Sequence, residues 1–276
     1  MQQKTIRLRI RRQDRPGANQ YWQRFEVPRQ PQMNVISCLQ AVAANPVTTD
    51  GRRTTPVAWD CNCLEEVCGA CTMNINGRVR QACTALVDQL LDQAPGGEIV
   101  LEPMNKFPVV RDLFVDRSRM FHALKRVHAW IDVAGYHDAG DGPRVSPEEQ
   151  EEAYPLSRCM SCGCCLEVCP QYSKIDLPRH AGESDADFDA RRHAAYDEAF
   201  LGAAAISQAM LFNTHPTGRL TARERLEALM APGGITDCGN AQNCVKVCPK
   251  DIPLTRSIAQ AGRQTTLYAL KRWLTR

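Results

Sequence analysis

Two cysteine-rich stretches in the second half of the chain decide its fold. One reads Cys159-Met-Ser-Cys-Gly-Cys-Cys-Leu-Glu-Val-Cys-Pro170, and the other reads Cys238-Gly-Asn-Ala-Gln-Asn-Cys-Val-Lys-Val-Cys-Pro249. The first contains the spacing C-x2-C-x2-C-x3-C-P, in which three cysteines bind one iron–sulfur cluster and the fourth binds a neighbouring cluster. The second repeats that spacing with Ala241 in place of the second cysteine. A methyl group cannot bind iron, so one of the two clusters has only three thiolates.

These stretches predict a pair of clusters that exchange their last cysteines. The expected ligands of a [4Fe–4S] cluster are Cys159, Cys162, Cys165 and Cys248. The expected ligands of a [3Fe–4S] cluster are Cys169, Cys238 and Cys244. Cys164 fits neither spacing, and we expect it to be a packed or capping thiol.

A third cysteine motif lies in the first half of the chain. Its spacing, C-x4-C-x2-C with a fourth cysteine further on, is that of a plant-type [2Fe–2S] site. The expected ligands are Cys63, Cys68, Cys71 and Cys83. Cys61 would leave a gap of six residues instead of four, so we expect it to be a spare thiol. Cys38 lies in an expected helix and is interpreted as a small buried hydrophobe.

The hydrophobic pattern predicts two domains and an α+β fold. The first domain, residues 1–104, combines a small mixed sheet with one helix. Its expected strands span residues 4–12, 21–27, 73–75, 79–81 and 99–101, and its expected helix spans residues 33–43. The second domain, residues 105–276, is expected to be all-α, with no strand beyond about residue 105. Its expected helices span residues 109–134, 185–212, 221–230 and 253–273, and another begins at Ser146.

Fourteen cysteines in 276 residues are far above ordinary usage. Extracellular disulfides would require a secretory leader, and the first ten residues lack its apolar segment. The chain is also long enough to fold without disulfide staples. Zinc is a further alternative, since paired C-x2-C elements often bind it, but it explains neither four-cysteine motif. The composition therefore favours iron–sulfur ligation in a reducing compartment.

Charge and hydropathy limit the possible partners. The formal net charge of +3 is too small to indicate a nucleic acid. The first 55 residues carry ten Lys or Arg against three Asp or Glu, which indicates a solvated basic face or a docking patch for an acidic partner. No segment is apolar over the roughly 18 residues that span a membrane. The tail from Leu270 to Arg276 is amphipathic; a solvated helix end is the favoured interpretation, and lipid headgroups or an anchor protein are the alternatives.

The order of the three motifs resembles the iron–sulfur subunits of succinate dehydrogenase and fumarate reductase. The resemblance covers nearly the whole chain, including Phe107-Pro-Val-Val-Arg-Asp-Leu113 and Phe212-Asn-Thr-His-Pro-Thr-Gly218. It implies an N-terminal plant-type ferredoxin (β-grasp) domain followed by an all-α domain like the bacterial ferredoxins. The sequence is most similar to the form found in Gram-positive bacteria, which is often linked to menaquinone.

The resemblance also implies partners and a place in the cell. Electrons would pass from a flavoprotein subunit with bound FAD, through the three clusters, to a quinone at a cytochrome b anchor with haem b. The chain would lie on the cytoplasmic face of the bacterial cell membrane. Because clusters are one-electron carriers between two-electron partners, no catalytic acid, base or nucleophile is expected in this chain.

Some alternatives stay open at this point. The same motifs serve fumarate reduction, and they could serve another flavoprotein assembly of the heterodisulfide-reductase type; a free ferredoxin fits the length less well. The Trp and His that help ubiquinone-reducing relatives form a quinone pocket are absent here. The residues expected near a quinone or the anchor are Pro170, Tyr172, Lys174, Gly239 and His215. For His215, a solvated turn residue is the favoured interpretation, and contact with the anchor is the alternative.

Overall fold

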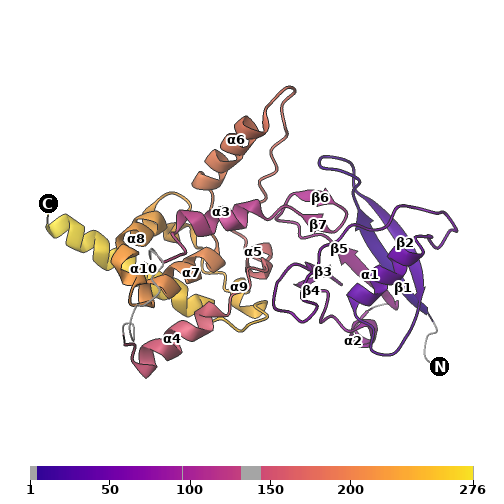
Figure 1. Cartoon of the computed structure of the whole chain (residues 1–276), viewed down its shortest axis with the longest axis horizontal. Coiled ribbons are helices and arrows are strands. Elements are labelled where there is room, and N and C mark those ends of the chain that lie inside the picture. Colours follow the sequence, from indigo (N-terminus) through magenta and orange to yellow (C-terminus); the bar gives the residue numbers. More distant parts are fainter. Residues whose placement is uncertain (1–4, 95, 132–143, 276) are drawn as a thin grey trace, which may run out of the picture. The chain divides into compact units, whose positions relative to one another are not determined.

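A computed structural model of the chain describes residues 5–94, 96–131 and 144–275 (Figure 1). These residues form two compact units, and each unit consists of two separate segments of the chain. The first unit comprises Met1–Arg117 and Met160–Glu167, and the second comprises Ser118–Cys159 and Val168–Arg276. The boundary expected at residue 104 remains a prediction.

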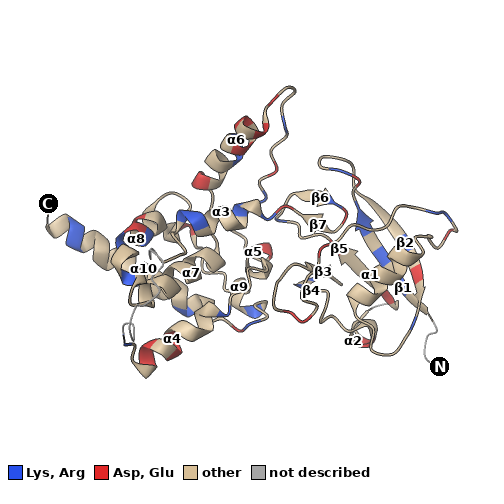
Figure 2. Cartoon of the chain, viewed as in Figure 1, with Lys and Arg blue, Asp and Glu red and all other residues tan. Residues whose placement is uncertain are grey.

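The first unit is built on a five-stranded mixed sheet with the strand order β2-β1-β5-β3-β4. Its strands are β1 (Thr5–Arg12), β2 (Tyr21–Pro28), β3 (Thr72–Ile75), β4 (Arg78–Gln81) and β5 (Glu98–Glu102). β1 pairs with β2 in the antiparallel sense and with β5 in the parallel sense. The alternation in β1 buries Ile6, Leu8 and Ile10 completely, because successive side chains point to opposite faces of a strand. The five expected strands are confirmed. Figure 2 shows that β1 also carries basic residues.

The helix α1 (Val35–Ala44) contributes more buried side chains to this core than any other helix of the first unit. Asn34 caps it, since its side-chain oxygen accepts a hydrogen bond from the Ser37 N–H at 2.9 Å. Cys38 is fully buried in this helix, and burial raises the pKa of its thiol to about 12, as befits an inert packing residue. A second short helix, α2 (Val87–Asp92), was not expected from the sequence.

The helix expected over residues 109–134 is wrong at both ends, since the structure has a helix only over Ser118–Arg126. The expectation of no strand beyond about residue 105 is also wrong. Residues 109–115 form a two-stranded ribbon of β6 (Val109–Arg111) and β7 (Phe114–Val115), and α3 begins only at Ser118. The turn at Asp112 has a φ of 49°, which a helix does not allow. Its buried carboxylate accepts hydrogen bonds from the N–H groups of Gln13 at 3.1 Å and Ala58 at 2.8 Å. These distant partners override the local pattern; residues 132–134 lie outside the described residues.

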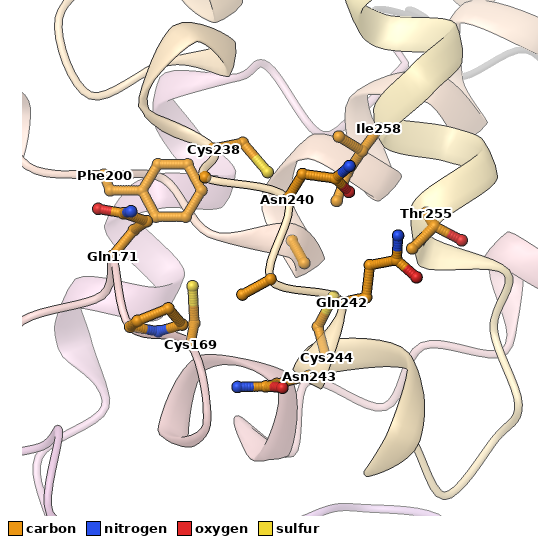
Figure 3. A pocket seen from close by; sticks show the side chains of 14 residues that line it. Cys169, Gln171, Phe200, Cys238, Asn240, Gln242, Asn243, Cys244, Thr255 and Ile258 are labelled. Atoms are coloured by element: carbon orange, nitrogen blue, oxygen red, sulfur yellow. The ribbon is translucent and has the colours of Figure 1, made fainter.

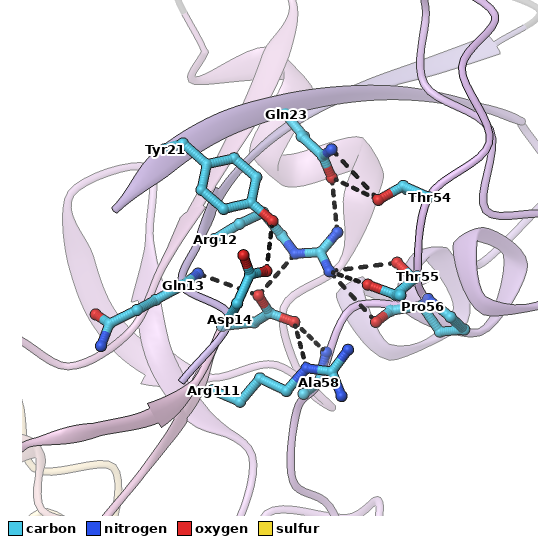
Figure 4. A network of polar contacts seen from close by, with 11 residues as sticks. Arg12, Gln13, Asp14, Tyr21, Gln23, Thr54, Thr55, Pro56, Ala58 and Arg111 are labelled. Carbon is cyan, nitrogen blue, oxygen red and sulfur yellow. Dashed lines mark hydrogen bonds and ion pairs between the residues drawn. The ribbon is translucent and has the colours of Figure 1, made fainter. Parts of the chain in front are cut away.

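The same carboxylate forms a buried ion pair in the first unit. The Arg12 Nε donates to the Asp112 Oδ1 at 2.7 Å, and both side chains are fully buried (Figure 4). Arg12 also donates to Gln23 Oε1 at 2.7 Å and to Thr55 Oγ1 at 3.1 Å. Each of the three guanidinium nitrogens thus donates to an oxygen atom. Such hydrogen bonds offset the free energy that is lost when a charged group is removed from water.

The segment Met160–Glu167 belongs to the first unit although it lies far along the chain. It ends in the short helix α5 (Cys164–Glu167). The buried Glu167 carboxylate accepts hydrogen bonds from the Asn74 side chain at 2.9 Å and from the backbone N–H groups of Asn105 and Lys106 at 2.7 and 3.0 Å. One late residue therefore satisfies donors in β3 and in the loop after β5.

Among the described residues of the second unit, all regular secondary structure is helical. Its helices are α3 (Ser118–Arg126), α4 (Pro147–Ser157), α6 (Asp185–Glu198), α7 (Ala203–Thr214), α8 (Ala222–Met230), α9 (Asn243–Lys246) and α10 (Leu254–Leu274). α7 is the central helix, buried along most of its length and packed by α3, α4, α8 and α10. No helix of the described residues is both long and apolar enough to cross a bilayer.

One expectation for this unit needs correction. The single helix expected over residues 185–212 is two helices, because Leu201 N–H donates to Gly233 O at 2.8 Å and Gly202 has a φ of 86°. Thr221 does not cap α8 with its side chain; its hydroxyl accepts a hydrogen bond from the buried Arg225 at 3.0 Å. The helix expected to begin at Ser146 is confirmed as α4, with Ser146 as its N-cap, and the structure adds a capping box with Glu149.

Candidate metal centres

The loop that carries Cys63 points several backbone N–H groups at one sulfur. The N–H groups of Glu65, Val67 and Cys68 lie 3.5, 3.2 and 3.3 Å from the Cys63 Sγ. Leu64 and Glu66 both have left-handed backbone conformations, with φ values of 63° and 58°. Alternating handedness of this kind turns successive N–H groups into one concave surface, which suits an anion.

This geometry distinguishes Cys63 from Cys61. The N–H of Glu65, followed by that of Val67, lowers the pKa of the Cys63 thiol to about 7. Burial instead raises the pKa of Cys61, and the charge of Asp60 adds to the effect. Iron binds the thiolate, so the loop stabilises the required form at Cys63 and disfavours it at Cys61.

Of the other three cysteines of this motif, Cys68 lies in the same loop, where its Sγ accepts a hydrogen bond from the Cys63 N–H at 3.5 Å, and two lie at the sheet. Cys71 directly precedes β3 and Cys83 follows β4, and both are buried. Burial raises the pKa of the Cys83 thiol to about 11. A bound metal cation would have the opposite effect and lower the pKa of this thiol, because a thiol that coordinates a metal is deprotonated.

Gly69 lets the backbone of this loop pass close to the segment that carries Cys162. A Cβ at this position would lie 2.7 Å from the Cys162 Cα, and the φ of +69° already favours glycine. The Gly69 carbonyl accepts hydrogen bonds from Arg117 Nη1 and Thr72 Oγ1, both at 2.7 Å. The loop is therefore held in one position by named contacts.

The stretch around Cys162 repeats the left-handed pattern. Ser161 and Gly163 have φ values of 50° and 85°. A hydrogen bond from the Cys164 thiol lowers the pKa of Cys162 to about 7, and the same bond raises the pKa of Cys164. Gln81 Nε2 donates to the buried Cys164 Sγ at 3.4 Å. Cys164 is therefore a packed thiol, and its own hydrogen bond goes to the Cys162 sulfur. Of the four expected [4Fe–4S] ligands, Cys162 and Cys165 belong to the first unit, and Cys159 and Cys248 to the second.

In the second unit, the three remaining cysteines line one pocket (Figure 3). Cys169, Cys238 and Cys244 line it together with Ala241, and its cavity volume is about 30 Å³. Asn240 and Gln242, on either side of Ala241, are left-handed with φ values of 50° and 59°.

The two walls of this pocket are also tied together. The side chain of Asn243 donates to Val168 O at 3.2 Å, next to Cys169. A Cβ on Gly239 would lie 2.5 Å from Gln171 Nε2, so a larger residue at 239 would displace that amide. The pocket thus combines three thiols with a methyl group at the position where the repeated motif has its second cysteine.

The chemistry of these donor sets fits clusters better than single ions. Zinc holds four thiolates at about 2.3 Å, which brings their sulfur atoms within roughly 4.6 Å of one another. Within the described ranges, no three His, Cys, Asp or Glu side chains converge closely enough to hold one metal ion. A cluster spaces its ligands around several irons, which suits cysteines that line one pocket from separate segments of the chain, as in Figure 3.

The residues expected near a quinone are placed differently from one another. Pro170 and Gly239 line the cysteine pocket. Tyr172 is fully buried, with the Arg119 guanidinium 3.8 Å from its ring centre. Lys174 forms an ion pair with Asp176 at 2.7 Å. His215 ends α7, and its Nδ1 accepts hydrogen bonds from the Thr217 and Gly218 N–H groups at 3.2 and 3.3 Å.

The structure adds pocket residues that sequence reasoning missed. Gln171, Asn240 and Gln242 line the pocket beside the cysteines, and their adjacency in sequence was a usable signal. Phe200 also lines it, from the break between α6 and α7, and no motif marks that position.

Comparisons with known proteins agree with these centres. A family model described as a 2Fe-2S iron-sulfur cluster binding domain matches residues 7–122. A second model, described as a 4Fe-4S dicluster domain, matches residues 155–252. The succinate dehydrogenase iron-sulfur subunit of Bacillus subtilis is 52% identical over 98% of this chain and 96% of its own length. The chain belongs to the family of succinate dehydrogenase iron–sulfur subunits.

More distant relatives of this succinate dehydrogenase family extend the match. The fumarate reductase iron-sulfur subunit of Wolinella succinogenes is 29% identical over 88% of this chain and 89% of its own length. A chain of the Mycobacterium smegmatis Sdh1 complex in the apo form shares the fold, with a TM-score of 0.67 and 21% identity over 95% of both chains. The resemblance inferred from the cysteine motifs is confirmed.

Proposed function

We propose that this chain is the electron-transfer subunit of a membrane-bound succinate:quinone oxidoreductase. The observation that supports it most strongly is the full-length relationship to the Bacillus subtilis subunit, combined with three cysteine motifs in order. Flavin and quinone exchange electron pairs, whereas each cluster stores one electron, so a series of clusters connects the two.

The ligand sets follow from the cysteine spacing and are proposed on that basis. The [2Fe–2S] cluster is held by Cys63, Cys68, Cys71 and Cys83 in a domain of residues 1–104. A second domain, residues 105–276, holds the other two clusters. The [4Fe–4S] ligands are Cys159, Cys162, Cys165 and Cys248, and the [3Fe–4S] ligands are Cys169, Cys238 and Cys244. The protein's contribution is to hold these thiolates, aim N–H groups at sulfur and control burial, which together set the potentials.

The partners are proposed from family membership. A flavoprotein subunit with FAD supplies electrons, and a cytochrome b anchor with haem b holds the chain at the cytoplasmic face of the membrane. Menaquinone is the proposed acceptor, near the cysteine pocket that Pro170 and Gly239 line. Tyr172, Lys174 and His215 are proposed to lie at the same side of the complex.

Purification of the native complex from membranes tests this function. We expect a flavoprotein with bound FAD to co-purify with the chain and to reduce a dye when succinate is added. Fumarate reduction is the second candidate, favoured by the Wolinella succinogenes relative, and turnover measured in both directions distinguishes the two. A chain that elutes alone, without flavin, would contradict both.

The choice of Cys63 over Cys61 predicts a contrast between two matched variants. Cys63→Ser removes a ligand and should lower [2Fe–2S] affinity by at least the ~10–100-fold lost with outer-shell partners. Cys61→Ser makes the same chemical change two residues away and should leave the cluster intact. The electron paramagnetic resonance (EPR) signal of the reduced [2Fe–2S] cluster measures both. An undisturbed signal in Cys63→Ser with a lost signal in Cys61→Ser would reverse the assignment.

A further inference from the structure

The last helix of the second unit has two unlike faces. α10 buries Leu254, Ser257, Ala261 and Thr265, which are spaced by three or four residues and so share one face. Tyr268 continues this face and donates to Glu227 of α8 at 2.6 Å. Beyond Thr265, few positions of α10 are covered, and Figure 1 shows its C-terminal end projecting past α8.

A second, apolar face runs along the uncovered part of α10. Leu267, Leu270 and Leu274 are spaced as i, i+3 and i+7, so they lie on one side, and Trp273 lies beside them. Their exposed fractions are 55%, 52%, 74% and 71%. At 100° per residue, this stripe lies opposite the buried face. Four large apolar side chains gathered on one exposed surface indicate a contact, unlike single exposed leucines.

The charged residues of α10 itself are all basic. α10 contains no Asp or Glu, and Figure 2 shows only basic colouring along it. Its Arg263 and Lys271 are exposed and lie one turn before and one turn after Leu267. Leucines and a tryptophan on one face, with Lys and Arg at its borders, are typical of helices that lie in the interface of an anionic bilayer. Trp is enriched at that depth, and the aliphatic stems of Lys and Arg let their charges reach the phosphates.

We propose that residues 263–274 of α10 lie on an anionic lipid surface, with Leu267, Leu270 and Leu274 among the upper acyl chains. Arg263 and Lys271 pair with lipid phosphates, and Trp273 lies at the headgroup level. The stripe from Leu267 to Leu274 is about 10 Å long, which suits a helix that lies on the bilayer. A solvated helix end, favoured from the sequence alone, does not explain a continuous apolar stripe opposite the packed face. The proposal does not depend on succinate chemistry.

Vesicle sedimentation with the full-length, cluster-loaded chain tests this inference. We expect the chain to sediment with vesicles of phosphatidylcholine and phosphatidylglycerol in equal parts, and far less with phosphatidylcholine alone. Because the attraction includes exposed charges, added salt should weaken it. The triple variant Leu267→Ser, Leu270→Ser and Leu274→Ser should lose at least roughly 100-fold in partitioning. The visible absorption of the clusters should stay unchanged, since these positions are exposed.

The charge contribution is measured separately. Each Lys or Arg near an anionic surface contributes about fivefold, so Arg263→Gln with Lys271→Gln should lower partitioning roughly 25-fold. Arg52→Gln with Arg53→Gln removes the same charge from an exposed site in the first unit and should have little effect. Leu220→Ser, at a position 82% exposed outside α10, is the control for the leucine changes.

Four outcomes would overturn the proposal. The first is no binding to anionic vesicles, and the second is binding that the α10 variants leave unchanged. The third is a dimer that the leucine variants dissociate, which would assign the stripe to a second copy of the chain. If the same variants instead abolished binding to the purified anchor protein while lipid binding persisted, the stripe would belong to that protein.

Discussion

Ala241→Cys is expected to convert the [3Fe–4S] centre into a [4Fe–4S] centre. Ala241 lies on the wall of the pocket that Cys169, Cys238 and Cys244 line, at the position where the repeated motif has its second cysteine. A thiol there supplies the missing ligand for a fourth iron. Low-temperature EPR of the oxidised protein should lose nearly all of the three-iron signal, and the iron content should rise by one atom per chain.

A second alanine of the same pocket gives the matched control. Ala203 also lines the pocket, but from α7 and outside the cysteine motif. Ala203→Cys adds a thiol to the same space and should leave the three-iron signal in place. If the signal survived at full occupancy in Ala241→Cys, or vanished equally in Ala203→Cys, the ligand assignment would be wrong.

Asp112→Ala is expected to destabilise the first unit by about 3–5 kcal/mol, because it leaves the buried Arg12 charge without its partner. The N–H groups of Gln13 and Ala58 lose their acceptor at the same time. Alanine also fits the left-handed conformation at φ 49° poorly, whereas Asn adopts it more readily. Urea unfolding, followed by circular dichroism of the cluster-loaded chain, measures the change in the free energy of unfolding.

Two further variants separate the causes. Asp112→Asn keeps one oxygen acceptor and the turn, so it should cost less than Asp112→Ala. Asp50→Ala breaks the exposed ion pair with Arg52. It should lower the urea midpoint of unfolding far less than Asp112→Ala does, since solvent screens exposed ion pairs. Equal effects of Asp112→Ala and Asp50→Ala would show that burial of the Arg12 pair does not matter.

Much of this architecture could be predicted from local patterns. The alternation of Ile6, Leu8 and Ile10 predicted β1, and the four-residue gap from Cys63 to Cys68 identified a loop whose N–H groups do gather on the Cys63 sulfur. Such features depend on neighbours in sequence, so a one-dimensional pattern contains them.

The misses depend on partners far along the chain. The β6–β7 ribbon exists because Asp112 accepts hydrogen bonds from residues 99 and 54 positions away. The break between α6 and α7 depends on Leu201 pairing with Gly233, and that break places Phe200 at the cysteine pocket. Hydrophobic periodicity has no information about these partners, so it continued each helix through the turn.

The late segment Met160–Glu167 has a consequence for how the protein is made. Asn74, Asn105 and Lys106 are synthesised long before Glu167, the carboxylate that accepts their hydrogen bonds. While the ribosome is still adding the intervening residues, these donors have no acceptor at Glu167, and the N-terminal unit is incomplete. A fragment that stops at residue 117 would keep that defect permanently, so iron loading is best timed after translation has passed residue 167.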